Sequence, residues 1–268
     1  MSTLAYIVAA SLAGGVLSIV AAAGTLALHP SWISKLVSFA VGALLGAVFL
    51  ELLPHALETG KPEAVMITVL AGLLAFFLLE KLVLWRHSHG HADDAGGDRE
   101  HDRALAGDRA PGTPDAGDHG RSGLMILIGN SVHNLCDGVV IAAAFLADTT
   151  LGVATTLAIV SHAIPQQVGD FAVLLHSGYA RRRAFAFNLA TGAATLAGAL
   201  AGYFALADMA RVLPTVLAIA AASLLYVAVA DLIPSLHRRP EPVETLKQLA
   251  LIVLGIGVIA AAHHFLKD

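Results

Sequence analysis

Two short stretches of the chain combine metal-binding residue types at a helical spacing. His133 and Asp137 are four residues apart, and His162 and Gln166 repeat that step. Residues four apart lie on one face of an α-helix, one turn from each other. Two imidazoles, a carboxylate and an amide oxygen suit a borderline divalent ion such as zinc, whereas calcium or magnesium would prefer more oxygen ligands. The sequence therefore predicts that His133, Asp137, His162 and Gln166 bind a transition metal ion.

The composition indicates the environment of these residues. Of the 268 residues, 57% are apolar and only 13% are charged, against about 25% charged in a typical soluble domain. The apolar residues fall in runs of about twenty, the length that crosses a hydrocarbon layer roughly 30 Å thick. The formal net charge is −4, so no basic field points to nucleic acid. We expect an all-α polytopic membrane protein, and neither a soluble enzyme nor a nucleic-acid binder.

Eight apolar runs are candidate spans, near residues 4–28, 33–54, 64–86, 123–147, 151–176, 183–207, 212–234 and 246–266. The predicted organisation is three spans in residues 1–85, a polar segment in 86–122, and five spans in 123–268. Only residues 148–150 separate the fourth and fifth spans, so these must be antiparallel neighbours. At about 1.5 Å per residue, Asp137 and His162 then both lie near the membrane midplane.

Lysine and arginine predict the orientation, because short cytoplasmic loops are enriched in them. Loops on one side carry twelve of these residues and the opposite side carries three, namely Lys61, Arg211 and Lys267. The prediction is a multi-pass protein of a cell membrane, inner or plasma, with both termini outside the cytoplasm. The segment 86–122 is rich in Gly, Asp, Arg and His, and we expect it to be a disordered cytoplasmic loop. Its alternating His87, His89 and His91 suit weak zinc binding, although a solvated polar linker explains them too.

Ionisable residues inside a membrane are functional candidates, and five further polar residues qualify. Asn134 and Gln167 adjoin the four predicted ligands, where they either contact an ion or hold a ligand in place. Asp170 is an exit-side ligand or a partner of the Arg181–Arg183 cluster. Glu51 and His55, again four apart, lie at the outer end of the second span, where they either collect cations or are simply solvated.

The residues resemble the signatures of a known family. His133-Asn134-x-x-Asp137-Gly138 is similar to the fourth-helix motif of ZIP (Zrt-/Irt-like) divalent metal transporters, and His162-x-x-Pro165-x-x-x-Gly169-Asp170 is similar to their fifth-helix motif, HExPHExGD. The Leu-Pro end of the second span and the His-rich loop also resemble the family, and the stretch 225–234 is similar to the seventh helix of its histidine-rich subfamily. The resemblance implies a ZIP-like bundle of eight transmembrane helices in which spans one, four, five and six move against the others.

This chain also departs from the family pattern. The resemblance implies a second metal position that uses Asn134 and the first Glu of HExPHE, but Ala163 replaces that Glu. Gln166 and Gln167 replace the second His and the second Glu of that motif. We therefore expect one bound ion rather than two, with a single carboxylate to balance its charge.

The resulting hypothesis is an importer of Zn²⁺, or a similar divalent ion, into the cytoplasm, with no prosthetic group. The metal ion is then the substrate, and the lipid bilayer surrounds the protein. Small residues in 183–207 allow either close helix approach or a homodimer. Two alternatives remain: a metal sensor that binds without transport, which the departures at 163, 166 and 167 favour, and an intramembrane zinc hydrolase. The hydrolase lacks an HExxH motif and a spare carboxylate as base.

Overall fold

The computed structural model describes residues 2–24, 30–89, 121–176, 178–237 and 241–267. Every regular element in these ranges is helical. The α-helices are α1 (Thr3–Gly24), α2 (Pro30–Gly46), α3 (Leu53–Thr59), α4 (Pro62–His89), α5 (Arg121–Ala147), α6 (Thr149–His176), α7 (Arg181–Leu206), α8 (Leu213–Tyr226), α9 (Ile233–Leu236) and α10 (Pro242–Lys267). Two π-helical segments, Ala47–Leu52 and Val227–Leu232, join α2 to α3 and α8 to α9 without a break.

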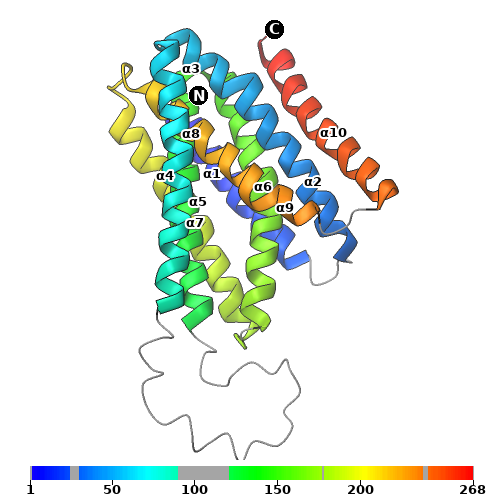
Figure 1. Cartoon of the computed structure of the whole chain (residues 1–268). Coiled ribbons are helices and arrows are strands. Elements are labelled where there is room, and N and C mark those ends of the chain that lie inside the picture. Colours follow the sequence, from blue (N-terminus) through cyan, green and yellow to red (C-terminus); the bar gives the residue numbers. More distant parts are fainter. Residues whose placement is uncertain (1, 25–29, 90–120, 177, 238–240, 268) are drawn as a thin grey trace, which may run out of the picture.

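The helices make eight passes through one bundle, because α2 with α3 and α8 with α9 each form a single pass (Figure 1). The all-α polytopic fold predicted from the sequence is confirmed. Both chain ends lie at the same end of the bundle, and α4 ends and α5 begins at the opposite end (Figure 1).

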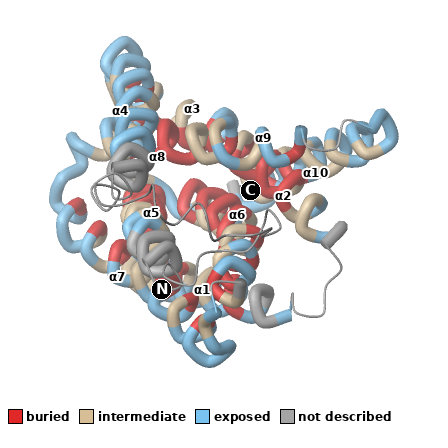
Figure 2. Tube along the Cα trace, turned by 60° about the horizontal axis from the view of Figure 1, so that its bottom comes forward, coloured by how far each residue is buried: buried red, intermediate tan, exposed pale blue. Residues whose placement is uncertain are grey.

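Seven of the eight passes are long and apolar enough to cross a membrane, as judged over the described ranges. The exception is α6, which has 28 residues but does not reach the hydropathy of the other seven passes over a span-length segment. Buried residues concentrate on α6 and on the faces of α2 and α8 that point to the interior, whereas α4 and α10 are largely exposed (Figure 2). The apolar exposed faces, such as Leu70, Leu74 and Leu78 of α4, suit contact with lipid.

Helices α5 and α6 form a tight antiparallel hairpin. Asp148 alone separates them, and its Oδ1 accepts hydrogen bonds from the backbone N–H groups of Thr150 and Leu151 at 2.8 and 3.1 Å. A side-chain oxygen at this position caps the N-terminus of a helix. The hairpin fixes the register between the His133–Asp137 turn and the His162 turn.

Glycines bring helix backbones into direct contact on both sides of the bundle. A Cβ on Gly138 would lie 2.0 Å from the carbonyl oxygen of Thr195, and a Cβ on Gly198 would lie 2.0 Å from that of Leu135. Helices α5 and α7 therefore pack with no space for a side chain between them, next to Asp137. Gly42 on α2 makes the same kind of contact with Ile252 on α10.

Candidate metal site

Three side chains from α5 and α6 converge in the bundle. The Nε2 atoms of His133 and His162 are 3.2 Å apart. Oδ2 of Asp137 lies 3.5 Å from Nε2 of His133 and 3.3 Å from Nε2 of His162. Among the His, Cys, Asp and Glu side chains of the described ranges, these three form the group whose ligand atoms lie close enough together to hold one ion.

The size of this triangle fits a four-coordinate zinc ion. Zinc binds imidazole nitrogen and carboxylate oxygen at about 2.0–2.2 Å in a tetrahedron. The edge of a tetrahedron is about 1.63 times the distance from its centre to a corner, so neighbouring ligand atoms lie about 3.3–3.6 Å apart. The three separations, 3.2, 3.3 and 3.5 Å, are at or next to this range. The side chains are therefore placed to act as three corners of a zinc site.

The site is buried on one side and accessible on the other. The side chains of Asp137 and His162 are 2% and 1% exposed, and that of His133 is 22% exposed. Nδ1 of His162 lies 3.4 Å from the carbonyl oxygen of Ala158. Donation of an Nδ1–H to that oxygen leaves the lone pair of Nε2 free for an ion, the usual arrangement for metal-binding histidines.

Gln166, the fourth predicted ligand, lies one turn after His162 on α6 and is half-buried. Its role as a ligand stays a prediction. α6 continues through Pro165 as one helix, although proline cannot donate a backbone hydrogen bond to Ser161.

Asn134 and Gln167 are buried on the side of the α5–α6 pair that faces α7. Oδ1 of Asn134 accepts a hydrogen bond from Thr195 at 3.4 Å, and its Nδ2 donates to the carbonyl oxygen of Asn130. Nε2 of Gln167 donates to Thr191 at 3.4 Å. Both residues thus hold neighbouring helices together in this structure.

Asp170 and Glu51 have partners that the sequence patterns did not suggest. The Asp170 carboxylate accepts a hydrogen bond from the Asn130 side chain of α5. Glu51 is 4% exposed, and both of its carboxylate oxygens lie 2.8 Å from Nδ1 of His263 on α10. His55 is half-buried one turn after Glu51.

A contact between residues 51 and 263 spans 212 positions, so no local spacing signals it. The histidines predicted to bind metal in the loop cannot be placed: His91 lies outside the described residues, and for His87 and His89 only the helical backbone of α4 is described.

The match to known families decides what kind of protein carries this site. A family model described as ZIP zinc transporter matches residues 1–263. The chain belongs to the ZIP family. The resemblance of its two intramembrane motifs to this family is therefore confirmed along nearly the whole chain.

Curated ZIP proteins are similar to the chain at about the same level in several animals. Zinc transporter ZIP13 of Homo sapiens is 31% identical over 262 residues, which cover 85% of this chain and 70% of that protein. Zinc transporter SLC39A7 of Mus musculus is 30% identical and covers 88% of this chain and 63% of that protein. Zinc transporter ZIP5 of Homo sapiens is 32% identical, with 84% and 51% covered. The chain thus spans about half to seven tenths of the length of these three relatives.

Proposed function

We propose that this ZIP-family chain carries Zn²⁺, or a similar divalent transition metal, across a cell membrane into the cytoplasm. His133, Asp137 and His162 bind the ion near the membrane midplane, and Gln166 or water supplies the fourth ligand. The observation that carries the proposal is the triangle of ligand atoms with edges of 3.2–3.5 Å. The names of the relatives, all zinc transporters, support zinc as the substrate.

The charge of the site suits transient rather than permanent binding. Asp137 is its one carboxylate, and His133, His162 and Gln166 are neutral ligands. A divalent ion therefore keeps a net charge of about +1 in the site, which is costly away from water. This weak compensation favours release, as a transporter needs, over tight retention.

The packing around the site supports a path toward the end of the bundle where α5 begins. On the other side of the site the facing helices are closed: residues 140–145 of α5 and Leu151, Ala154 and Ala158 of α6 are buried. His133, the partly exposed ligand, is the one nearest the N-terminus of α5. We infer that this end faces the cytoplasm, with both chain termini outside, in line with the distribution of Lys and Arg.

Acidic side chains on the same side would assist the ion. Asp231, in the second π-helical segment, is exposed and close enough to His133 and His162 for their charges to interact. Glu80 of α4 is close enough to Asp231 for their like charges to repel, and it accepts a hydrogen bond from Tyr226. Negative charge at this place lowers the energy of a cation that leaves the site.

Metal uptake into sealed proteoliposomes with a trapped zinc-sensitive dye tests the proposal. The wild type is compared with Asp137→Ala and His162→Ala for Zn²⁺, Cd²⁺, Mn²⁺, Fe²⁺ and Ni²⁺. Asp208→Ala and His237→Ala are matched controls, because both residues are exposed outside the bundle core. Saturable uptake that both site variants abolish and both controls retain is the expected result.

Two other outcomes would reject transport by this site. Stoichiometric zinc binding with no flux of any ion would identify a metal sensor. Uptake that survives both site substitutions would place the path elsewhere in the bundle.

A further inference from the structure

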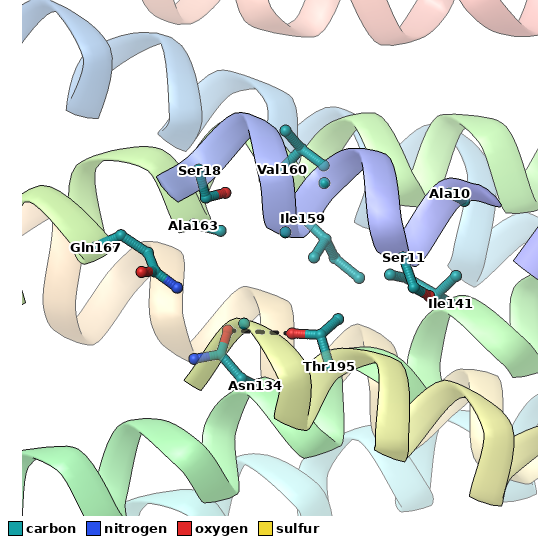
Figure 3. A pocket seen from close by; sticks show the side chains of 13 residues that line it. Ala10, Ser11, Ser18, Asn134, Ile141, Ile159, Val160, Ala163, Gln167 and Thr195 are labelled. Carbon is teal, nitrogen blue, oxygen red and sulfur yellow. Dashed lines mark hydrogen bonds between the residues drawn. The ribbon is translucent and has the colours of Figure 1, made fainter. Parts of the chain in front are cut away.

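A small cavity lies beside the candidate metal site, on the side that faces α1 and α7 (Figure 3). It is lined by residues of four helices and has a volume of about 20 Å³ for the centre of a water-sized sphere. One water molecule needs about 10–15 Å³ on this measure. The cavity therefore has room for one water molecule and little more.

Buried polar atoms without hydrogen-bond partners indicate that the cavity holds a bound molecule. Ser11, Ser18 and Gln167 line the cavity, and each is 2% exposed. Their hydroxyl oxygens and the Oε1 of Gln167 have no hydrogen-bond partner in the described protein. Figure 3 shows Gln167, Asn134 and Thr195 around the same space, with Ser18 on the opposite wall. Cavities that stay empty are apolar, and buried polar groups without partners normally bind ordered water.

The residues at the cavity argue against a second divalent ion. Every polar side chain that lines it is a neutral hydroxyl or amide. Ala163, which lines the cavity next to His162, supplies no carboxylate. A divalent cation there would be buried with no charged partner in the lining, which is strongly unfavourable.

We propose that this cavity is a water site, that the water bonds to Gln167 Oε1 and to the Ser18 hydroxyl, and that it occupies the space beside a mononuclear metal centre. The water satisfies buried polar atoms of α1 and α6 and links these two helices. It gives Gln167 and Ser18 a structural role, separate from the ion ligands. The water site itself does not require the chain to transport zinc.

Pulsed X-ray radiolysis of the full chain in detergent tests the proposal, because a trapped water generates hydroxyl radicals that oxidise the side chains next to it. Ile159 and Ile141 line the cavity and are 3% and 1% exposed. Ile259 of α10 is 0% exposed and does not line it. We expect oxidation of Ile159 or Ile141 severalfold above that of Ile259. Equal oxidation of all three would overturn the proposal.

Filling the cavity is the second arm. A Cβ on Gly192 meets only Ile19 Cδ1 at 3.5 Å and Gly15 Cα at 3.9 Å, so Gly192→Ala adds a methyl group at the cavity wall without a clash. The expected result is loss of the excess label at Ile159 and Ile141. Gly257→Ala is the matched control, because its Cβ would meet nothing within 4 Å. Persistence of the label in Gly192→Ala and in a second filling variant, Ala163→Val, would overturn the proposal.

A third arm distinguishes water from a cation. With saturating Zn²⁺, we expect unchanged labelling of Ile159 and the loss of one bound zinc ion per chain on Asp137→Ala. Loss of the label on zinc addition, or the loss of two ions, would show that the cavity takes a metal. Loss of the label in Na⁺ relative to choline buffer would assign it to an alkali cation. Failure of zinc transport alone would leave the labelling result unchanged, so the two proposals fail separately.

Discussion

Asp137 carries the only negative charge among the four proposed ligands, and its side chain is 2% exposed. Asp137→Asn keeps the shape of the side chain and removes the charge. We expect the zinc affinity to fall by more than the 10–100-fold typical for loss of an outer-shell partner. Isothermal titration calorimetry checks this, with Asp208→Asn as the control at an exposed position. An affinity within a factor of about two of wild type would remove Asp137 from the site.

The two imidazoles of the site predict how zinc binding responds to pH. A histidine binds metal only in its neutral form, so protons compete with zinc. We expect the affinity to fall as pH is lowered, at up to about 100-fold per pH unit where both imidazoles are protonated in the free protein. Equilibrium zinc binding as a function of pH measures the slope. His133→Ala leaves one imidazole and should halve the limiting slope; an unchanged slope would contradict the assignment.

Residue spacing predicted that His133, Asp137 and His162 come together, because their arrangement is local. His133 and Asp137 share a helix turn, and the single residue Asp148 brings the His162 turn back against them. The spacing of residues along one helix does not predict partners on distant helices. The contact of Glu51 with His263 and that of Asp170 with Asn130 arise from tertiary packing, which no spacing of four encodes.

Two glycines on α10 differ in what surrounds them, although they are two residues apart. A Cβ on Gly255 would lie 2.4 Å from the carbonyl oxygen of Phe39 on α2, whereas one on Gly257 would meet nothing within 4 Å. We expect Gly255→Ala to destabilise the protein by about 1–3 kcal/mol through overpacking. Gly257→Ala is expected to be neutral or to stabilise by up to about 1 kcal/mol through helix propensity. Thermal unfolding of the two variants in one detergent compares them directly, and equal melting temperatures would contradict the close α2–α10 contact.

The two π-helical segments show a limit of sequence reasoning at the level of elements. Ala47–Leu52 and Val227–Leu232 were each predicted as part of a regular span. A proline, Pro54 or Pro234, lies two residues after the end of each segment. Proline cannot donate a backbone hydrogen bond. The apolar runs in the sequence predicted the length of both passes. The wider turn of a π-helix depends on packing with neighbouring helices, and the periodicity of apolar residues does not reveal it.

For the whole molecule, the loop and the intramembrane site are expected to act separately. Replacing His87, His89 and His91, at and just after the end of α4, together by alanine should lower the number of zinc ions bound per chain, because a His-rich stretch binds zinc weakly. Uptake by the site between α5 and α6 should remain. Equilibrium dialysis with elemental analysis counts the ions, and Asp93, Asp94 and Asp98 changed to alanine provide a control for charge. An unchanged ion count in the His variant would show that the loop is only a linker.

The lower hydropathy of α6 has a consequence for how the protein is made. Polar residues near the centre of a segment disfavour its insertion into a membrane. On membrane-insertion scales the cost for a charged residue there is about 2.5–3.5 kcal/mol. A nascent α6 is therefore a weaker insertion signal than the other seven passes. Its one-residue connection to α5 allows the two helices to enter the bilayer together as a single hairpin. Insertion of α6 is thus expected to depend on α5, and the predicted ligands on the two helices are sheltered from lipid only when the hairpin is complete.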